Sequence, residues 1–151
     1  MVIRVLGGIK MKRIFTFVIV TCLMLICSVG FAANDHKDLA KQQKVAETFM
    51  DVFDVEPAPM YAQVAAGFSE NLKKAVSEKG FTELQKQVRT KFGIAKEAKL
   101  FTFQRYEQMD GLVYNVTFTK EKMVSVVFVF DKQSKLLDFA FTPVQQPEGK
   151  K

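Results

Sequence analysis

The sequence predicts an α+β fold, in which helices pack on a curved, four-stranded antiparallel sheet. Two observations lead to this prediction. From about position 36, apolar residues recur at spacings of three and four, which is the period of an amphipathic helix. After Gly93 the spacing changes to two, which is the period of a strand with one buried face. Helices followed by an antiparallel meander form one helical layer on one sheet.

The helical half of the chain is divided by prolines, glycines and capping residues. Pro57 and Pro59 end the first helix, and Gly93 ends the last one in the manner of a C-terminal cap glycine. Ser77 and Thr82 are alternative N-caps for that last helix. Helical segments are therefore predicted over 36–54, 60–66, 70–76 and from one of the two caps to residue 92.

The strands are predicted over 100–109, 112–119, 123–131 and 136–142. Asp110 and Gly111 form a dipeptide that is typical of a tight hairpin turn, so we place the first turn there. In the last strand, Leu137 alternates in phase with two phenylalanines and is predicted to share their face. Large side chains that should face the helices are Tyr114, Phe118, Phe128, Phe130, Phe139 and Phe141.

Residues 11–32 have the layout of a secretory signal peptide. A basic start at Lys12 and Arg13 precedes an apolar run, and Gly30 and Ala32 provide the small residues of a cleavage site. The apolar run is shorter than the ~20 residues that a spanning helix needs, so we expect cleavage; an N-terminal membrane anchor is the alternative. The protein is then exported, either periplasmic or secreted, with no stable membrane span after cleavage.

The sequence also indicates how the chain is divided on either side of the predicted signal peptide. Residues 1–10 add nothing that a signal peptide needs, so we interpret them as an extension in front of a true start at Met11. Residues 33–143 are predicted to form a single domain, because no repeat or linker interrupts them. The tail over 144–151 is predicted to be disordered.

Composition narrows the classes of function. Both cysteines, Cys22 and Cys27, lie in the leader, the single histidine is His36, and there is no tryptophan. Hydrolases that need a thiolate, an imidazole or a zinc site are therefore excluded, and we expect neither a metal nor a cofactor. Four of the 22 lysines and arginines lie in residues 1–32, so 18 basic residues remain in the predicted mature chain against 16 acidic ones. This balance argues against a nucleic-acid partner.

Two stretches carry a family resemblance: "VSEKGFTELQKQVRTKFG" and "VVFVFDKQSKLLDFAFTP". With the leading helix, they resemble small exported bacterial domains of unknown function in the nuclear-transport-factor-2-like (cystatin-like) superfamily. The resemblance covers about residues 38–143. It implies a cone-shaped fold with a pocket between sheet and helices. Enzymes, binding modules and dimerisation domains all occur in that superfamily, so the fold does not select a function.

Three functional hypotheses remain open. The first is a non-catalytic binding or accessory module of the cell envelope. Its small apolar ligand would be oriented by Tyr61, Tyr106 and Tyr114, whose alternative role is as core residues. The second is an isomerase-like or dehydratase-like enzyme that uses Glu107 as a pocket carboxylate. Glu107 shares a predicted strand face with Arg105, and an exposed pair of these two residues is the alternative reading.

The third hypothesis is a protein-binding or inhibitor scaffold that acts through the outer sheet face. Val113, Thr117, Val127 and Val129 are the predicted interface residues on that face. A strand that is apolar on both faces normally has both faces covered, so we expect a homodimer or another cell-envelope protein there. The alternative is that these residues reflect β-propensity alone.

Overall fold

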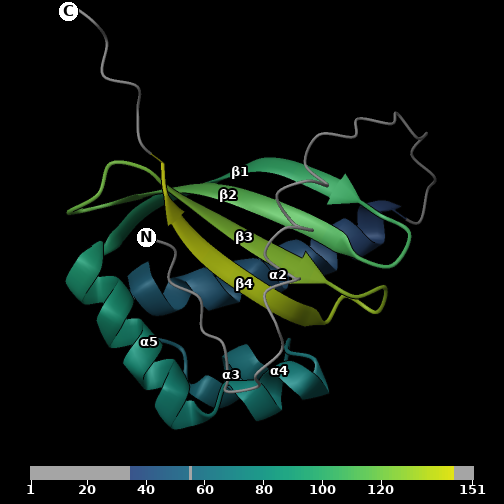
Figure 1. Ribbon diagram of the computed structural model, residues 1–151, viewed down its shortest axis with the longest axis horizontal. Helices are drawn as coiled ribbons and strands as arrows, with labels where there is room; N and C mark the ends of the chain where they lie inside the picture. Colours follow the sequence, from purple (N-terminus) through teal and green to yellow (C-terminus); the bar gives the residue numbers. More distant parts are fainter. Residues whose placement is uncertain (1–34, 55, 145–151) are drawn as a thin grey trace, which may run out of the picture.

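The computed structural model describes residues 35–54 and 56–144, in a helical layer and one sheet (Figure 1). The α+β class is confirmed. The predicted start extension, the signal peptide and residues 145–151 of the tail lie outside the described residues. None of the described helices is long and apolar enough to cross a membrane. The elements are α2 (Asp35–Asp54), α3 (Tyr61–Ala65), α4 (Glu70–Ala75), α5 (Glu78–Lys91), β1 (Ala95–Arg105), β2 (Asp110–Phe118), β3 (Val124–Phe130) and β4 (Leu136–Pro143).

The four strands form an antiparallel meander in the order β1-β2-β3-β4. Buried and half-buried residues alternate along β2 and β3 without a break, as the period-two pattern predicts. Phe128 lies between Leu112 and Phe139 in the register, and all three face the helical layer. The ring of Phe49 on α2 lies 4.6 Å from that of Phe139 and 5.4 Å from that of Phe128, so α2 is the main cover of this face.

The predicted tight turn at Asp110 and Gly111 is wrong. Both residues belong to β2, where they pair with Arg105 and Gln104 of β1. The hairpin turn lies over 106–109 and is closed by a backbone hydrogen bond from Tyr106 to Met109 of 2.9 Å. The physical reason is that the Asp110 carboxylate is buried among donors from other elements, which outweighs the local turn preference. β1 also begins at Ala95 rather than at residue 100.

The predicted inward position of Leu137 is also wrong. Leu136 is fully buried, whereas Leu137 is 38 % exposed. A shift of register opposite Phe130 makes Leu137 an extra residue in β4. The backbone of Leu136 also bonds to the segment before α4: its N–H donates to Gly67 at 2.8 Å, and its carbonyl accepts from Ser69 at 2.9 Å. These two bonds hold Leu136 at the core and turn Leu137 outward.

The ends of α5 are set by the residues that the sequence indicated. Of the two candidate caps, Ser77 is the N-cap, and its hydroxyl accepts a hydrogen bond from the Gly80 amide at 3.2 Å. Thr82 lies within the helix and donates to the Glu78 carbonyl. After the helix, Gly93 has a φ of +89°, and a Cβ there would lie 1.9 Å from the Thr119 hydroxyl. Only glycine fits this position, which confirms the helix end.

Candidate functional site

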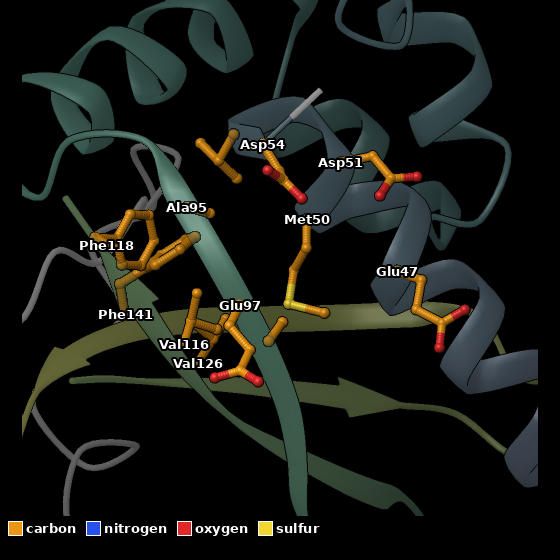
Figure 2. Close-up of a pocket in the computed structure, with 12 residues that line it drawn as sticks. Glu47, Met50, Asp51, Asp54, Ala95, Glu97, Val116, Phe118, Val126 and Phe141 are labelled. Atoms are coloured by element: carbon orange, nitrogen blue, oxygen red, sulfur yellow. The ribbon is translucent and has the colours of Figure 1, made fainter. Parts of the chain in front are cut away.

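A cavity of about 90 Å³ lies between α2 and the sheet, with residues of all four strands in its lining (Figure 2). We call it the α2–β1 cavity. Apolar side chains from both layers form its floor, and carboxylates stand around its opening. The floor consists of Met50, Phe53, Val116, Phe118, Val126 and Phe141, and the carboxylates are Glu47, Asp51, Asp54 and Glu97.

The size and floor of this cavity indicate what it can hold. The hollow is open to solvent among its carboxylates, so its floor decides which group it can enclose. An ordered water in such a place needs two to four polar partners. The floor side chains offer none. A short apolar group of a few carbons therefore suits the floor better than water does.

The carboxylates at the opening are mostly uncompensated. Glu97 forms an ion pair with Lys99 at 2.9 Å. Within the described part of the chain, Glu47, Asp51 and Asp54 have no ion pair or side-chain hydrogen bond. Partial burial, and next the charge of Asp54, raise the pKa of Asp51 above its usual value. The opening of the cavity is therefore a region of negative potential.

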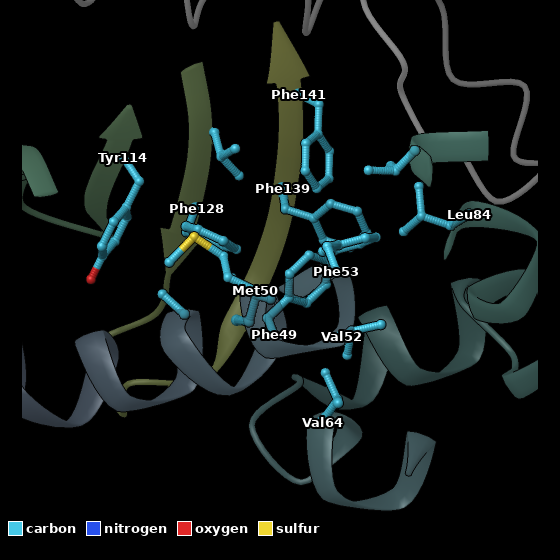
Figure 3. Close-up of a cluster of buried hydrophobic side chains, with 14 of the residues drawn as sticks. Phe49, Met50, Val52, Phe53, Val64, Leu84, Tyr114, Phe128, Phe139 and Phe141 are labelled. Carbon is cyan, nitrogen blue, oxygen red and sulfur yellow. The ribbon is translucent and has the colours of Figure 1, made fainter. Parts of the chain in front are cut away.

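Tyr114, one of the three predicted ligand tyrosines, is a core residue next to this cavity but does not line it. It is 3 % exposed, and Figure 3 shows it at the edge of the aromatic cluster, with the hydroxyl directed away from Phe128. Burial, and next the charge of Glu47, raise the pKa of Tyr114 to about 12, whereas Gln43 opposes the shift. The amide of Gln43 is close, but the hydroxyl forms no hydrogen bond of good geometry with it.

The other two predicted tyrosines lie elsewhere. The Tyr61 hydroxyl on α3 donates to the Val76 carbonyl at 2.5 Å. The Tyr106 hydroxyl in the β1–β2 turn donates to the Gln104 side chain at 2.5 Å. The fold therefore does not bring the three tyrosines to one pocket, and none of them lines the α2–β1 cavity.

The predicted catalytic candidate, Glu107, is exposed in the β1–β2 turn. Its predicted place on a strand face beside Arg105 is wrong, because β1 ends at Arg105. The Arg105 guanidinium instead contacts Asp110 at 3.2 Å and Asp38 at 3.3 Å. Glu107 therefore does not line the cavity.

A buried carboxylate cluster, which the sequence did not reveal, lies beside this turn. Asp110 has no exposed surface, and two donors reach each of its carboxylate oxygens. The Lys132 ammonium at 2.8 Å and Arg105 Nε at 3.2 Å donate to Oδ1. Gln42 Nε2 at 2.8 Å and Arg105 Nη2 at 3.3 Å donate to Oδ2.

This cluster is suited to holding the fold together. Burial favours the neutral acid, but the hydrogen bonds from Lys132, Arg105 and Gln42 outweigh it and lower the pKa of Asp110. A general base needs a free lone pair and a pKa near the working pH, and Asp110 has neither. Its partners come from α2, β1 and the β3–β4 turn, so the cluster ties these elements to β2.

The predicted interface residues share the sheet face that the helices leave uncovered. Val113 lies opposite Val127, and Val129 lies opposite Gly111 in the same pair of strands. Thr117 lies further along β2, opposite Glu97. All four predicted residues are half-buried by their strand neighbours alone. The predicted facing is confirmed, and what covers this face stays a prediction.

Comparison with known proteins gives no relative: no family model, no curated protein and no solved structure matches this chain. Among the residues that the structure describes, no three His, Cys, Asp or Glu side chains are grouped so that they could hold a metal ion. The functional argument therefore rests on the geometry and charge of the described residues.

Proposed function

We propose that this protein is a non-catalytic binding module whose site is the α2–β1 cavity. The observation that carries the proposal is an apolar hollow that opens among four carboxylates, three of which have no ion pair with a described residue. The order of helices and strands supports the superfamily resemblance as part of this proposal. The signal-peptide layout supports a place in the cell envelope, either periplasmic or secreted.

The charges at the opening select the chemical class of ligand. An alkyl or aromatic group would enter the cavity, and an ammonium group would remain beside Asp51 and Asp54. That cation would offset the repulsion that contributes to the raised pKa of Asp51. We therefore propose a small apolar amine. Neutral or anionic ligands of the same shape would bind less tightly.

The expected affinity of a minimal ligand is low. Enclosing about three methylene groups contributes roughly 2–3 kcal/mol, at about 0.8 kcal/mol each. An exposed ion pair adds at most about 1 kcal/mol. The sum corresponds to a dissociation constant of roughly millimolar, so the test needs a method that detects weak binding.

Methyl NMR provides such a test because Met50 lines the cavity. Protein labelled at the methionine methyl groups is titrated with n-butylamine, n-butanol and n-butyrate at constant ionic strength. We expect a saturable shift of the Met50 methyl signal, with the amine binding most tightly and butyrate least. Met60, which is 69 % exposed, should not show this shift. A Met50 signal that none of the three probes shifts saturably contradicts the proposal.

A cavity-filling variant makes the test specific. Ala98 lines the cavity from β1, so Ala98→Leu should fill it and abolish the butylamine shift. Thr102→Leu is the matched control, because Thr102 lies on the same strand but pairs with Val113 on the outer face. Butylamine binding that survives Ala98→Leu unchanged would place the site elsewhere.

One observation favours the isomerase-like or dehydratase-like alternative, and it moves the base from Glu107 to Asp51. A carboxylate with a raised pKa beside an apolar cavity is the usual setting of a general base. Under this alternative, the protein should accelerate deuterium exchange at the α-carbon of a small ketone such as 2-butanone. Asp51→Asn should abolish the acceleration. Exchange at the rate of buffer alone rejects this alternative.

The outer sheet face supports a second part of the proposal, an association through Val113, Thr117, Val127 and Val129. The side chains of β2 and β3 on this face are small and uncharged: Gly111, Val113, Asn115, Thr117, Ser125, Val127 and Val129. The charged residues of this face lie on the two outer strands, where Lys99 is opposite Asn115 and Asp138 is opposite Val129. The uncharged centre of the face suits a second copy of the same chain, because few charges have to be matched across a two-fold axis. We propose a homodimer, with another cell-envelope protein as the alternative partner.

A further inference from the structure

A second hollow, of about 370 Å³, borders α2 away from the α2–β1 cavity, and the two share no lining residue. It lies between α2, the segment around α3 and the β3–β4 turn. We call it the lysine groove. Its polar lining residues are Lys41, Lys44, Thr48, Gln63, Gln133, Ser134 and Lys135.

The charge of this groove is entirely positive. Three lysines line it, and no aspartate or glutamate does. Lys41 and Lys44 have no ion pair with any described residue. Lys135 donates to the Ala66 carbonyl at 3.0 Å, which holds its ammonium group at the groove wall. Glu70, outside the lining, interacts electrostatically with Lys135, so the positive charge without a described partner is that of Lys41 and Lys44.

One wall of the groove is a preorganised turn. The Asp131 carboxylate accepts hydrogen bonds from the backbone amides of Gln133 at 2.9 Å and Lys135 at 2.8 Å. Ser134 between them is 6 % exposed, has a φ of 62°, and donates its amide to the Asp131 carbonyl at 3.0 Å. Because these amides are occupied, a ligand must be recognised by side-chain ammonium, amide and hydroxyl groups.

The floor of the groove is fixed by a close approach of the Gly67 backbone to the Val45 side chain. A Cβ on Gly67 would lie 2.5 Å from a methyl carbon of Val45 on α2. The Gly67 carbonyl also accepts the Leu136 amide at 2.8 Å, which joins this segment to β4. Glycine therefore lets the α3–α4 segment lie directly on α2 and β4. The lysines are thus carried on elements that are packed against one another.

We propose that the lysine groove binds a small organic polyanion, with at least two carboxylate or phosphate groups. Its volume lies in the range of small-molecule sites, about 300–1,000 Å³. Two anionic groups can be contacted at once by the three lysines, Lys41, Lys44 and Lys135. The part of the ligand between those two groups can be oriented by Gln63 and Gln133. This ligand class is opposite in charge to the amine proposed for the α2–β1 cavity, so the two sites are independent.

The test is an amide NMR titration of the folded domain with citrate and with pyrophosphate, against sodium chloride at equal ionic strength. Saturable shifts of the Gly67 and Gln133 amides by either probe, absent with chloride, support the proposal, and the tighter probe identifies the preferred oxyanion. Shifts that never saturate, or that chloride reproduces, mean an adventitious ion only and overturn it.

Two double variants distinguish binding in the lysine groove from a general attraction of anions to a positively charged protein. The double variant Lys41→Gln/Lys44→Gln should bind the tighter of the two probes about tenfold more weakly, because two ion contacts are lost. Lys96→Gln with Lys122→Gln removes the same charge from exposed positions outside the groove and should change the dissociation constant less than twofold. Equal weakening by the two double variants overturns the proposal.

Discussion

The side-chain nitrogen of Gln42 lies 2.8 Å from a carboxylate oxygen of Asp110, and neither residue has exposed surface. The two residues come from the first described helix and the second strand. Their contact anchors the first half of α2 to the beginning of β2, beside the hairpin where Arg105 and Lys132 also converge. The cluster therefore connects helix, hairpin and turn at one end of the sheet.

Replacing Asp110 by alanine should lower the free energy of unfolding by about 3–5 kcal/mol, because the variant leaves Arg105 and Lys132 without their buried counter-charge. Urea unfolding measures this loss. Glu97→Ala is the control, since it removes one partner of an exposed pair and should cost no more than about 1 kcal/mol. Equal losses in the two variants would contradict the structural role of the cluster.

The Asp110 carboxylate should make the free energy of unfolding depend on pH in the acid range. The pKa of Asp110 is lowered in the fold below its ordinary value of 3.8, so its contribution is fully present above that value. Stability is then lost as the pH falls from about 4 toward the folded-state pKa. In Asp110→Asn this group no longer titrates, so urea midpoints measured between pH 6 and pH 2 should fall less steeply. A variant that loses stability as steeply as wild type would refute the assignment.

Leu136 and Leu137 provide a direct test of the extra residue in β4. Leu136→Ala should cost about 2–5 kcal/mol, because Leu136 is fully buried. Leu137→Ala should cost less than about 1 kcal/mol, because that side chain is exposed. Urea unfolding of the two variants distinguishes this register from plain alternation, for which the order of the two losses would be reversed.

Association through the outer face predicts a dimer at tens of micromolar, which light scattering measures. Val127→Lys places a charge in the middle of that face and should give a folded monomer. Thr90→Lys on the exposed side of α5 is the control and should remain dimeric. A monomeric wild-type protein rules out the homodimer, and a Val127→Lys protein that stays dimeric places the interface on another surface.

Local sequence patterns predicted those parts of the fold that depend on local rules. The period of three to four residues identified α2, and Gly93 marked the end of α5 because caps act within one turn. The start of α5 was narrowed to two caps, of which the structure selects Ser77. The alternation in β2 and β3 assigned their faces correctly. These features depend only on residues that are close to one another in the sequence.

The errors occurred where a distant contact overrides a local preference. Asp110 would favour a turn beside Gly111, but its buried partners include Gln42, 68 positions earlier. Leu137 alternates correctly in sequence, but the backbone bonds of Leu136 to Gly67 and Ser69 shift the phase. The α2–β1 cavity and the lysine groove depend on how α2 sits between its neighbours, which no spacing along the chain reveals.

The register irregularity in β1 affects how readily two molecules of this protein can pair strand to strand at that edge. β1 is the first strand of the meander, so within the described part of the chain one of its edges has no strand beside it, and Phe101 on it is 69 % exposed. A flat edge with exposed apolar side chains would be a template for intermolecular strand addition and fibril growth. The register breaks near residues 96 and 101, so neither flank of the edge stays straight enough for a second chain to pair along its length. We therefore expect the bulge at Phe101 to oppose strand addition at the position of the most exposed apolar side chain on this edge.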